Sequence, residues 1–292
     1  MIVVTNAGGA VTSSVVQLAV IPYTPTMAGP ALQLDFDKNG SPGVQPGFTE
    51  MTLPMSGTNF GGVKVTLSPI GNITLLDRNR AEGGAMVVDN PPTLNESLVY
   101  NDFIFANSTT NGDGTRVRIE RLAHSTPYGV TIWSFDPQSL VPRISDWAET
   151  SSGASIVITN GYSFDGSVLP THDYDDTFGG LLTSSATGVL QIEGRKDGGV
   201  AGAPFSVFIN AIRLVANPVI RITDVQLVGG NIQLTIETQF PNQPISLWEE
   251  ADLASGTWAP ASGGGITEVH GPVVTAVFTL GPGPLFYRVS SP

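Results

Sequence analysis

The sequence predicts an all-β protein of the sandwich or barrel class, and three observations carry that prediction. Short runs of alternating or β-branched residues recur along the chain, separated by Gly, Pro, Asn and Asp. No stretch longer than about ten residues carries a 3.6-residue apolar period free of Gly and Pro. Gly and Pro number 34 and 22 among 292 residues, which suits a chain with many tight turns.

Composition excludes several classes of function. The 25 Asp and Glu outnumber the 13 Lys and Arg, and this charge of −12 argues against a nucleic-acid binder that relies on a basic patch. The chain has no cysteine, which excludes disulfides and Cys-ligated metal centres. No apolar run reaches the roughly 18 residues that a membrane span needs. We expect a secreted or cell-surface bacterial protein, although no signal peptide is recognisable after Met1.

The first segment is expected to form two short strands, Ile2–Thr5 and Ser14–Val20, joined by the turn Asn6–Gly9. Because an isolated hairpin is barely stable in water, this piece should belong to something larger. It resembles the last two strands of a bacterial immunoglobulin-like domain, which implies a remnant over residues 1–21 with exposed edge strands that allow self-association. Residues 22–31, rich in Pro and Thr, are expected to be a stiff linker.

The next segment carries the strongest strand patterns. In Thr115–Glu120, Val117 and Ile119 alternate with charged residues, as in an antiparallel strand with one solvated face. Phe205–Asn210 is apolar on both faces and is expected to be a central strand. Further strands are expected at Val63–Leu67, Ser97–Phe105, Tyr128–Trp133, Ala154–Thr159 and Gly188–Glu193.

Four segments of this middle part carry a family resemblance. The opening Leu34–Thr49, then Asp77–Arg80 and Leu98–Phe105, and the closing Phe208–Leu214 are similar to segments of galactose-binding-like jelly-roll modules of secreted bacterial carbohydrate-active proteins. The resemblance implies a jelly-roll β-sandwich over residues 32–216 that binds carbohydrate. The region is longer than typical members of the family, so inserted loops are expected.

The last segment, residues 219–292, is expected to form a small C-terminal β-sandwich domain. Val225–Ile236 reads as a hairpin around Gly229–Asn231. Leu247–Trp258 and Phe286–Val289 resemble parts of small C-terminal β-domains in multidomain bacterial secreted proteins. We interpret this segment as an accessory domain without visible chemistry.

A calcium site is the most testable chemical prediction. Asp35, Asp37, Asn39 and Gly40 match positions of an EF-hand loop, but Pro46 stands where that loop needs a bidentate Glu, so an EF-hand is excluded. In an extended segment Asp35 and Asp37 face the same side. With Asn39 and loop carbonyls they could hold one structural Ca²⁺, as the family resemblance also implies. The alternative is a strand that leads into an Asn-Gly turn with solvated carboxylates.

A candidate carbohydrate site lies in an acidic, aromatic segment that begins at His172. Sugar binding needs flat apolar faces for stacking and a few polar groups for the hydroxyls. We expect His172, Tyr174 and Asp175 to serve in this way, with Trp147 or Trp133 as the stacking platform. Trp133 also fits a core position, and Trp147, flanked by Asp146 and Glu149, is the better exposed candidate. The alternative is an acidic surface loop that favours solubility.

The function predicted from these features is non-catalytic polysaccharide binding by a secreted module. The alternative is a structural or adhesive β-domain of a cell-surface or filament-forming protein. A less favoured alternative is a polysaccharide lyase, in which Tyr162, His172 and Arg195 would supply proton abstraction and charge neutralisation, or a glycosidase, which needs two carboxylates across a cleft. No nucleophile elbow, P-loop or dinucleotide fingerprint occurs in the sequence.

Overall fold

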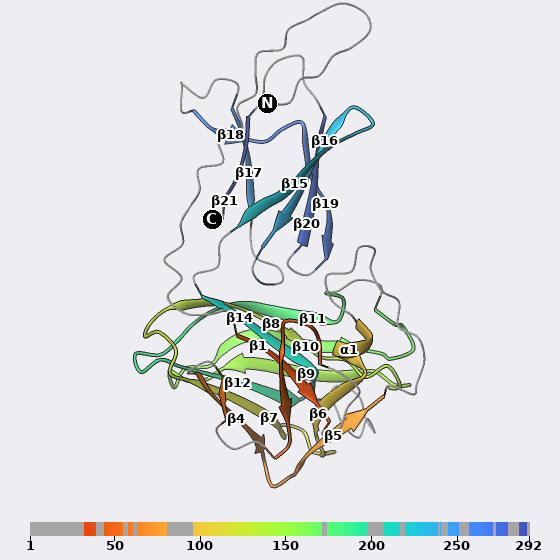
Figure 1. Ribbon diagram of the computed structural model, residues 1–292, viewed down its shortest axis with the longest axis vertical. Helices are drawn as coiled ribbons and strands as arrows, with labels where there is room; N and C mark the ends of the chain where they lie inside the picture. Colours follow the sequence, from red (N-terminus) through yellow and green to blue (C-terminus); the bar gives the residue numbers. More distant parts are fainter. Residues whose placement is uncertain are drawn as a thin grey trace, which may run out of the picture.

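The computed structural model describes residues 32–38, 44–54, 58–60, 63–80, 96–170, 174–197, 207–216, 220–238, 240, 245–250, 257–270, 273–279 and 286–290. The all-β prediction is confirmed, because strands from residues 32–216 form three sheets and strands from residues 221–290 form two (Figure 1). Among the described residues the only helix is the short α1 (Glu96–Tyr100). The expected immunoglobulin-like remnant and linker lie outside the described residues.

One layer of the larger unit is a five-stranded sheet. Across the sheet, its strands are β11 (Thr177–Thr183), β8 (Pro127–Trp133), β14 (Ala211–Ala216), β1 (Leu32–Asp37) and β2 (Thr49–Thr52). β1 is antiparallel to β14, with Asp35 opposite Ala211, and parallel to β2, with Asp35 opposite Glu50. A strand on each side of β1 therefore keeps its two aspartates away from the edge of the sheet.

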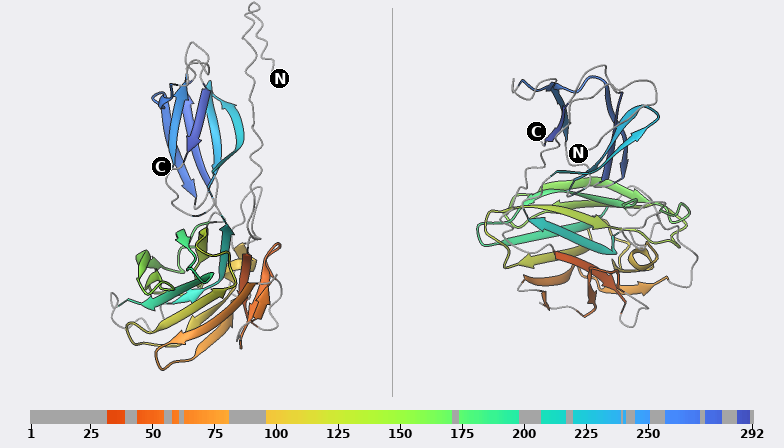
Figure 2. Two further views of the ribbon diagram at one scale, coloured as in Figure 1. Left: turned by 90° about the vertical axis from the view of Figure 1, so that its left-hand side faces the viewer. Right: turned by 45° about the horizontal axis from the view of Figure 1, so that its top comes forward.

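The facing layer is a six-stranded sheet, which packs on the first as Figure 2 shows. Across it, the strands are β10 (Ile156–Phe164), β9 (Arg143–Glu149), β12 (Val189–Lys196), β7 (Gly114–Glu120), β4 (Val63–Ile70) and β3 (Thr58–Phe60). On β7, Val117 and Ile119 are fully buried, while Arg116 forms an ion pair with Glu193 on the outer face at 2.8 Å. The prediction of a half-solvated strand at this position is confirmed.

A three-stranded sheet closes one end of the sandwich. Its strands are β13 (Phe208–Ile209), β6 (Asp102–Ala106) and β5 (Leu75–Asn79). Alternate residues of β6 enter two different cores: Ile104 joins the aliphatic core between the two large sheets, and Phe103 joins an aromatic cluster beside it. The expected central strand at 205–210 is short here: β13 lies at the edge of this small sheet, and the chain then continues as β14, which is central.

The C-terminal strands form two sheets of their own. Four strands pair in the order β15 (Arg221–Val228), β16 (Asn231–Glu237), β20 (Val273–Thr279) and β19 (Gly264–His270), and three in the order β18 (Ala259–Pro260), β17 (Ser246–Glu250) and β21 (Phe286–Ser290). The expected hairpin is β15–β16, whose turn uses Gly229 and Gly230 at φ values of 59° and 83°. These positive values suit glycine because it lacks a Cβ. Leu234, Ile236 and Phe278 form the centre of the core between the two sheets.

Candidate metal centre

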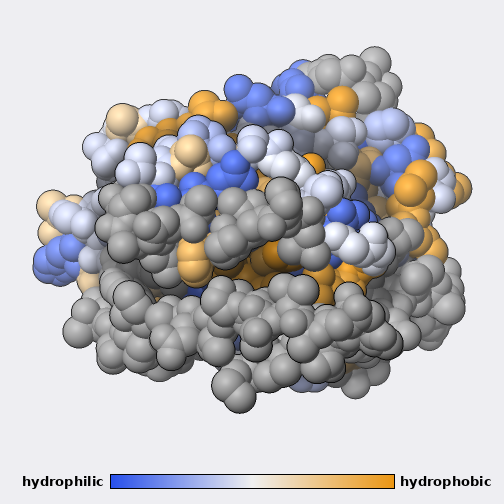
Figure 3. Space-filling model, turned by 90° about the horizontal axis from the view of Figure 1, so that it is seen from above, coloured by the Kyte–Doolittle hydropathy of each residue, from blue (hydrophilic) through white to orange (hydrophobic). Residues whose placement is uncertain are grey.

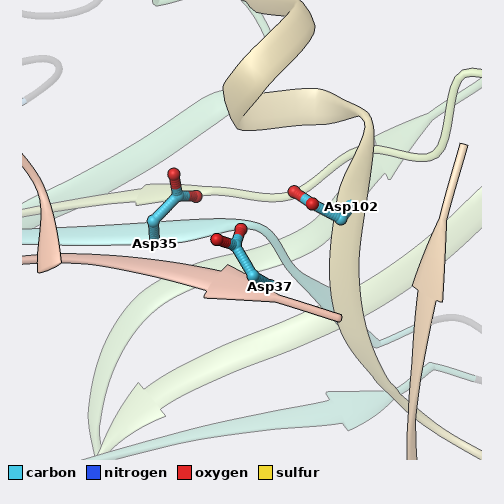
Figure 4. Close-up of side chains that lie close together, drawn as sticks. All are labelled: Asp35, Asp37 and Asp102. Carbon is cyan, nitrogen blue, oxygen red and sulfur yellow. The ribbon is translucent and has the colours of Figure 1, made fainter. Parts of the chain in front are cut away.

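Three buried carboxyl groups meet at the end of β1. Asp35 and Asp37 come from β1 and Asp102 opens β6, and one carboxylate oxygen from each lies within 4.8 Å of the others. Figure 4 shows the carboxyl groups of the two β1 residues beside each other, with that of Asp102 approaching from the neighbouring strand. Asp35 and Asp37 are both 0% exposed, so the group is closed off from bulk water.

The local fold explains how the carboxyl groups come together. Asp35 and Asp37 share a face of β1 because side chains alternate along a strand, and Leu34 and Phe36 fill the aliphatic core on the other face. The prediction that the two aspartates face the same way therefore agrees with the structure. Carboxylates are rarely buried unless something compensates their charge, so this arrangement points to a proton or a cation in the group.

A buried asparagine joins the strands that carry the three carboxyl groups. The Asn210 side chain accepts a hydrogen bond from the backbone N–H of Phe135 at 2.7 Å and donates one to the backbone carbonyl of Asp102 at 2.9 Å. The backbone carbonyl of Asn210 accepts a hydrogen bond at 2.7 Å from the backbone N–H of Phe36, the residue between the two β1 aspartates. Asn210 thus sets the position of β6 relative to β1.

The carboxyl groups receive few hydrogen bonds from the protein. The backbone N–H of Gln45 donates to Oδ2 of Asp35 at 2.6 Å. Within the described residues, no N–H or hydroxyl group donates to Oδ1 of Asp35 or to either carboxylate oxygen of Asp37. Asp37 therefore turns a fully buried carboxyl group toward two other acids, so its charge must be removed by a proton or balanced by a cation.

Burial and like charge shift the protonation of both β1 aspartates in the same direction. Burial raises the pKa of Asp35 to about 8. The hydrogen bond from the N–H of Gln45 lowers this pKa, and the negative charges of Asp102 and Glu50 raise it further. Burial, then the charge of Asp35, then that of Asp102, raise the pKa of Asp37 to about 9. Without a cation, the folded protein should therefore keep protons in this cluster at neutral pH.

The donor set fits a hard divalent cation. Ca²⁺ binds six to eight oxygen ligands at about 2.3–2.6 Å, so oxygens on opposite sides of the ion lie about 5 Å apart. The spread of at most 4.8 Å among the three carboxylate oxygens agrees with that size. Mg²⁺ usually keeps several of its waters, which fits poorly with two ligands that are fully buried. The residues present could therefore hold Ca²⁺, which would supply the missing positive charge.

Of the ligands predicted from the sequence, Asp35 and Asp37 lie together in the structure, and their role in binding a metal stays a prediction. Asn39 lies outside the described residues, so its predicted role stays a prediction. The sequence analysis missed Asp102 as a member of this group. The only signal for it was its place directly before the apolar run Phe103–Ala106. Asn210 was also missed as an organising residue, because its hydrogen-bond partners are far away in the sequence.

The two tryptophans expected to stack on a sugar do not offer a platform in this structure. Trp133 is 0% exposed and packs between Phe48 and Tyr174 at ring-centroid distances of 5.8 and 5.7 Å. Trp147 is 1% exposed and lies against Phe178 at 5.0 Å. Both side chains point into the interior of the protein, because burying a large aromatic ring removes much apolar surface from water. Their assignment as stacking residues is corrected to a packing role.

The remaining carbohydrate candidates lie in the turn before β11. Tyr174 and Asp175 are half-buried, and the hydroxyl of Tyr100 donates a hydrogen bond to the backbone carbonyl of Asp175. The next residue, Asp176, is held at φ 52°, and burial, with the charge of Asp175, raises its pKa to about 7. His172 lies outside the described residues.

Two residues named for the lyase alternative have structural contacts of their own. The hydroxyl of Tyr162 donates to the carbonyl of Ser134 at 2.7 Å, and burial raises the pKa of this hydroxyl well above its ordinary value. Arg195 donates to Glu193 at 2.7 Å on the outer face of β12. These contacts explain both residues as parts of the fold, and they do not join them to one another.

Comparisons with known proteins yield a faint likeness. No protein-family model matches the sequence, and no curated protein matches it significantly. Solved structures of a β-glucuronidase from Ruminococcus gnavus, one of them in complex with uronic isofagomine, align with 10% identity and TM-scores of 0.21 and 0.22. The alignments cover 80% of this chain but only 43% and 42% of those chains, and similarity at this level carries no argument about activity.

Among the described residues there is no helix with the length and apolar character that a membrane crossing requires.

Proposed function

We propose that residues 32–216 form a non-catalytic carbohydrate-binding module whose candidate binding turn is held in place by a Ca²⁺ at the Asp35, Asp37 and Asp102 group. The observation that supports the cation in this proposal is the state of Asp37: its carboxyl group is fully buried beside two other acids, and among the described residues no N–H or hydroxyl group donates to its oxygens. A divalent cation is the simplest group that satisfies all three carboxylates at once.

The candidate turn is connected to the metal centre through α1 and β6. Tyr100 ends α1 and holds the carbonyl of Asp175, and Asp102, only two residues later, supplies a carboxyl group to the centre. A cation that draws Asp102 toward β1 would therefore also hold Tyr100 and the turn of Tyr174 and Asp175. This gives the cation an effect on ligand binding without any contact to the ligand.

The cation is tested by thermal unfolding of the full chain in excess EGTA and in millimolar CaCl₂. A ligand that binds only the folded state stabilises it by about 2.7 kcal/mol at a hundred times its Kd, so the Tm should rise by several degrees. Asp37→Asn should abolish this rise and also raise the Tm of the metal-free protein at pH 8, because the parent chain must bind a proton at Asp37 when it folds at this pH and an amide needs none. Asp224→Asn, an exposed site on β15, should keep the full Ca²⁺ response. Equal melting temperatures with and without Ca²⁺ in the parent chain would remove the centre from the proposal.

The carbohydrate is tested separately, by affinity electrophoresis against neutral and uronate polysaccharides in the presence of Ca²⁺. Retardation by one polymer class is expected, with Tyr174→Ala weakening it about tenfold, which corresponds to one aromatic contact. Leu181→Ala, a change at a 53% exposed apolar residue of β11, should leave binding unchanged. If no polysaccharide retards the chain while the Ca²⁺ response persists, the ligand class is wrong and the cation site stands.

A structural or adhesive role is the second candidate, and one observation favours it. The edge strand β15 exposes Ile222, Val225 and Leu227 at 41%, 49% and 61%. Apolar residues on an unpaired strand edge promote association with a further strand. Light scattering over a range of protein concentrations tests this role: assembly that grows with concentration, together with no polysaccharide binding, would favour it.

A further inference from the structure

The four-stranded sheet of the C-terminal unit has an apolar face that extends beyond its cover. Ile222, Val225 and Leu227 of β15 stand opposite Ile236, Leu234 and Ile232 of β16 in the antiparallel register. The β16 residues are buried or half-buried in the core, whereas their three β15 neighbours are 41–61% exposed. The row of apolar side chains therefore extends beyond the core to β15, where its last members are exposed to solvent. Figure 3 views the molecule from the end of this unit, where hydrophobic and hydrophilic residues both reach the surface.

The edge of β15 is also free in its backbone pairing within the described part of the chain. β15 is the first strand of its sheet and pairs only with β16, and all eight of its residues are exposed. On its other face the side chain of Gln226 donates to Asp224 at 2.6 Å, and Val228 is 49% exposed. A strand with one apolar face and an unpaired edge is a template for strand addition.

Residues 14–20 have the pattern of the missing strand. Val16, Leu18 and Val20 recur with period two, while Val15, Gln17 and Ala19 occupy the alternate positions. The seven residues match the eight of β15 in length. A strand of this length needs a sheet to join, and β15 offers an unpaired edge in the described part of the chain.

The register of the sandwich brings this segment to β15. The chain enters β1 at Leu32, which pairs with Leu214, and β14 ends two residues later at Ala216, just before the chain passes to β15 at Arg221. Residues 21–31 can span up to about 35 Å, which is enough to place Val20 near the beginning of β15. The segment would then run toward the sandwich while β15 runs away from it, which makes the pair antiparallel.

We propose that residues 14–20 add an antiparallel strand to the free edge of β15 in the same molecule, with Val16, Leu18 and Val20 beside its uncovered apolar residues. The C-terminal unit is completed in this way by a segment from the other end of the chain. This interaction is independent of the cation and of the carbohydrate.

Disulfide trapping in the full chain tests the proposal, because the protein has no cysteine of its own. Leu18→Cys is combined in turn with Ile222→Cys, Val225→Cys or Leu227→Cys, and the three β15 positions are exposed. Facing residues of antiparallel strands lie within the Cα separation that a disulfide requires. We expect at least one pair to oxidise within the monomer, as shown by non-reducing electrophoresis and peptide mass. Leu18→Cys with Val269→Cys on the opposite edge strand β19 is the matched control and should not form a disulfide.

Hydrogen exchange supplies a second measurement that does not depend on cysteines. Deleting residues 1–21 should speed the exchange of alternate β15 amides at least tenfold, while the amides of β20 keep their rates. Disulfides found only between two molecules would replace this occupant with a second copy of the chain. Equal trapping at β19, or no trapping together with unchanged exchange, would overturn the proposal.

Discussion

Stability of the metal-free protein should fall as the pH rises from 5 to 7. In the folded state burial raises the pKa of Asp35 to about 8 and that of Asp37 to about 9, whereas in the unfolded chain both lie near the ordinary value of 3.8. Between pH 5 and pH 7 the folded protein thus binds protons that the unfolded chain has lost. These bound protons increase the free energy of unfolding at low pH, and this increase is lost as the pH rises toward the pKa values of the folded state.

The magnitude follows from the number of protons. Each group that stays protonated only in the folded state changes the free energy of unfolding by about 1.4 kcal/mol per pH unit. Two such groups over two pH units correspond to about 5 kcal/mol, a large part of the stability of an ordinary domain. Asp176, whose pKa is raised to about 7, acts in the same direction. The pKa of Glu193 is lowered because hydrogen bonds from Arg195 and Arg116 outweigh its burial, so its stabilising contribution is lost only in acid, below this window.

Urea unfolding at pH 5, 6 and 7 in EGTA measures this dependence. The parent chain should lose stability steadily, and Asp37→Asn should reduce the slope by about 1.4 kcal/mol per pH unit because one proton-binding group is gone. Asp224→Asn should keep the parent slope. Excess Ca²⁺ should flatten the dependence, since the ion replaces the protons. Stability that is constant or rises from pH 5 to pH 7 in EGTA would refute the reasoning for the cluster.

Three further predictions concern packing. Gly194→Ala should destabilise the protein by about 1–3 kcal/mol in urea unfolding, because a Cβ there would meet the Trp147 ring at 2.7 Å; Gly180→Ala, where a Cβ meets nothing within 4 Å, should be nearly neutral. Asn210→Ala should cost about 2–5 kcal/mol, since two buried backbone groups lose their partners; a loss under 1 kcal/mol would contradict its organising role. Trp147→Ala should cost about 3–5 kcal/mol, and a fully stable variant with altered polysaccharide binding would restore the stacking role instead.

The pattern within single strands was readable from the sequence, and the contacts between strands were not. Alternation at Thr115–Glu120 predicted a strand with one charged face, and the structure has Val117 and Ile119 buried there. The same alternation predicted that Asp35 and Asp37 share a face. The burial of Trp147 could not be predicted in this way, because its neighbours Asp146 and Glu149 are charged and suggested an exposed segment. The space for its ring comes from Gly194, a glycine in a different strand.

The sequence by itself determined the β class, the turn glycines of the β15–β16 hairpin and the pairing of two aspartates on one face, because each follows from residues a few positions apart. Only the tertiary structure decided that these aspartates are buried, that Asp102 joins them and that Asn210 fixes the strands around them. The physical reason is that period-two geometry acts along one strand, whereas burial and electrostatic coupling depend on which strands the fold brings together.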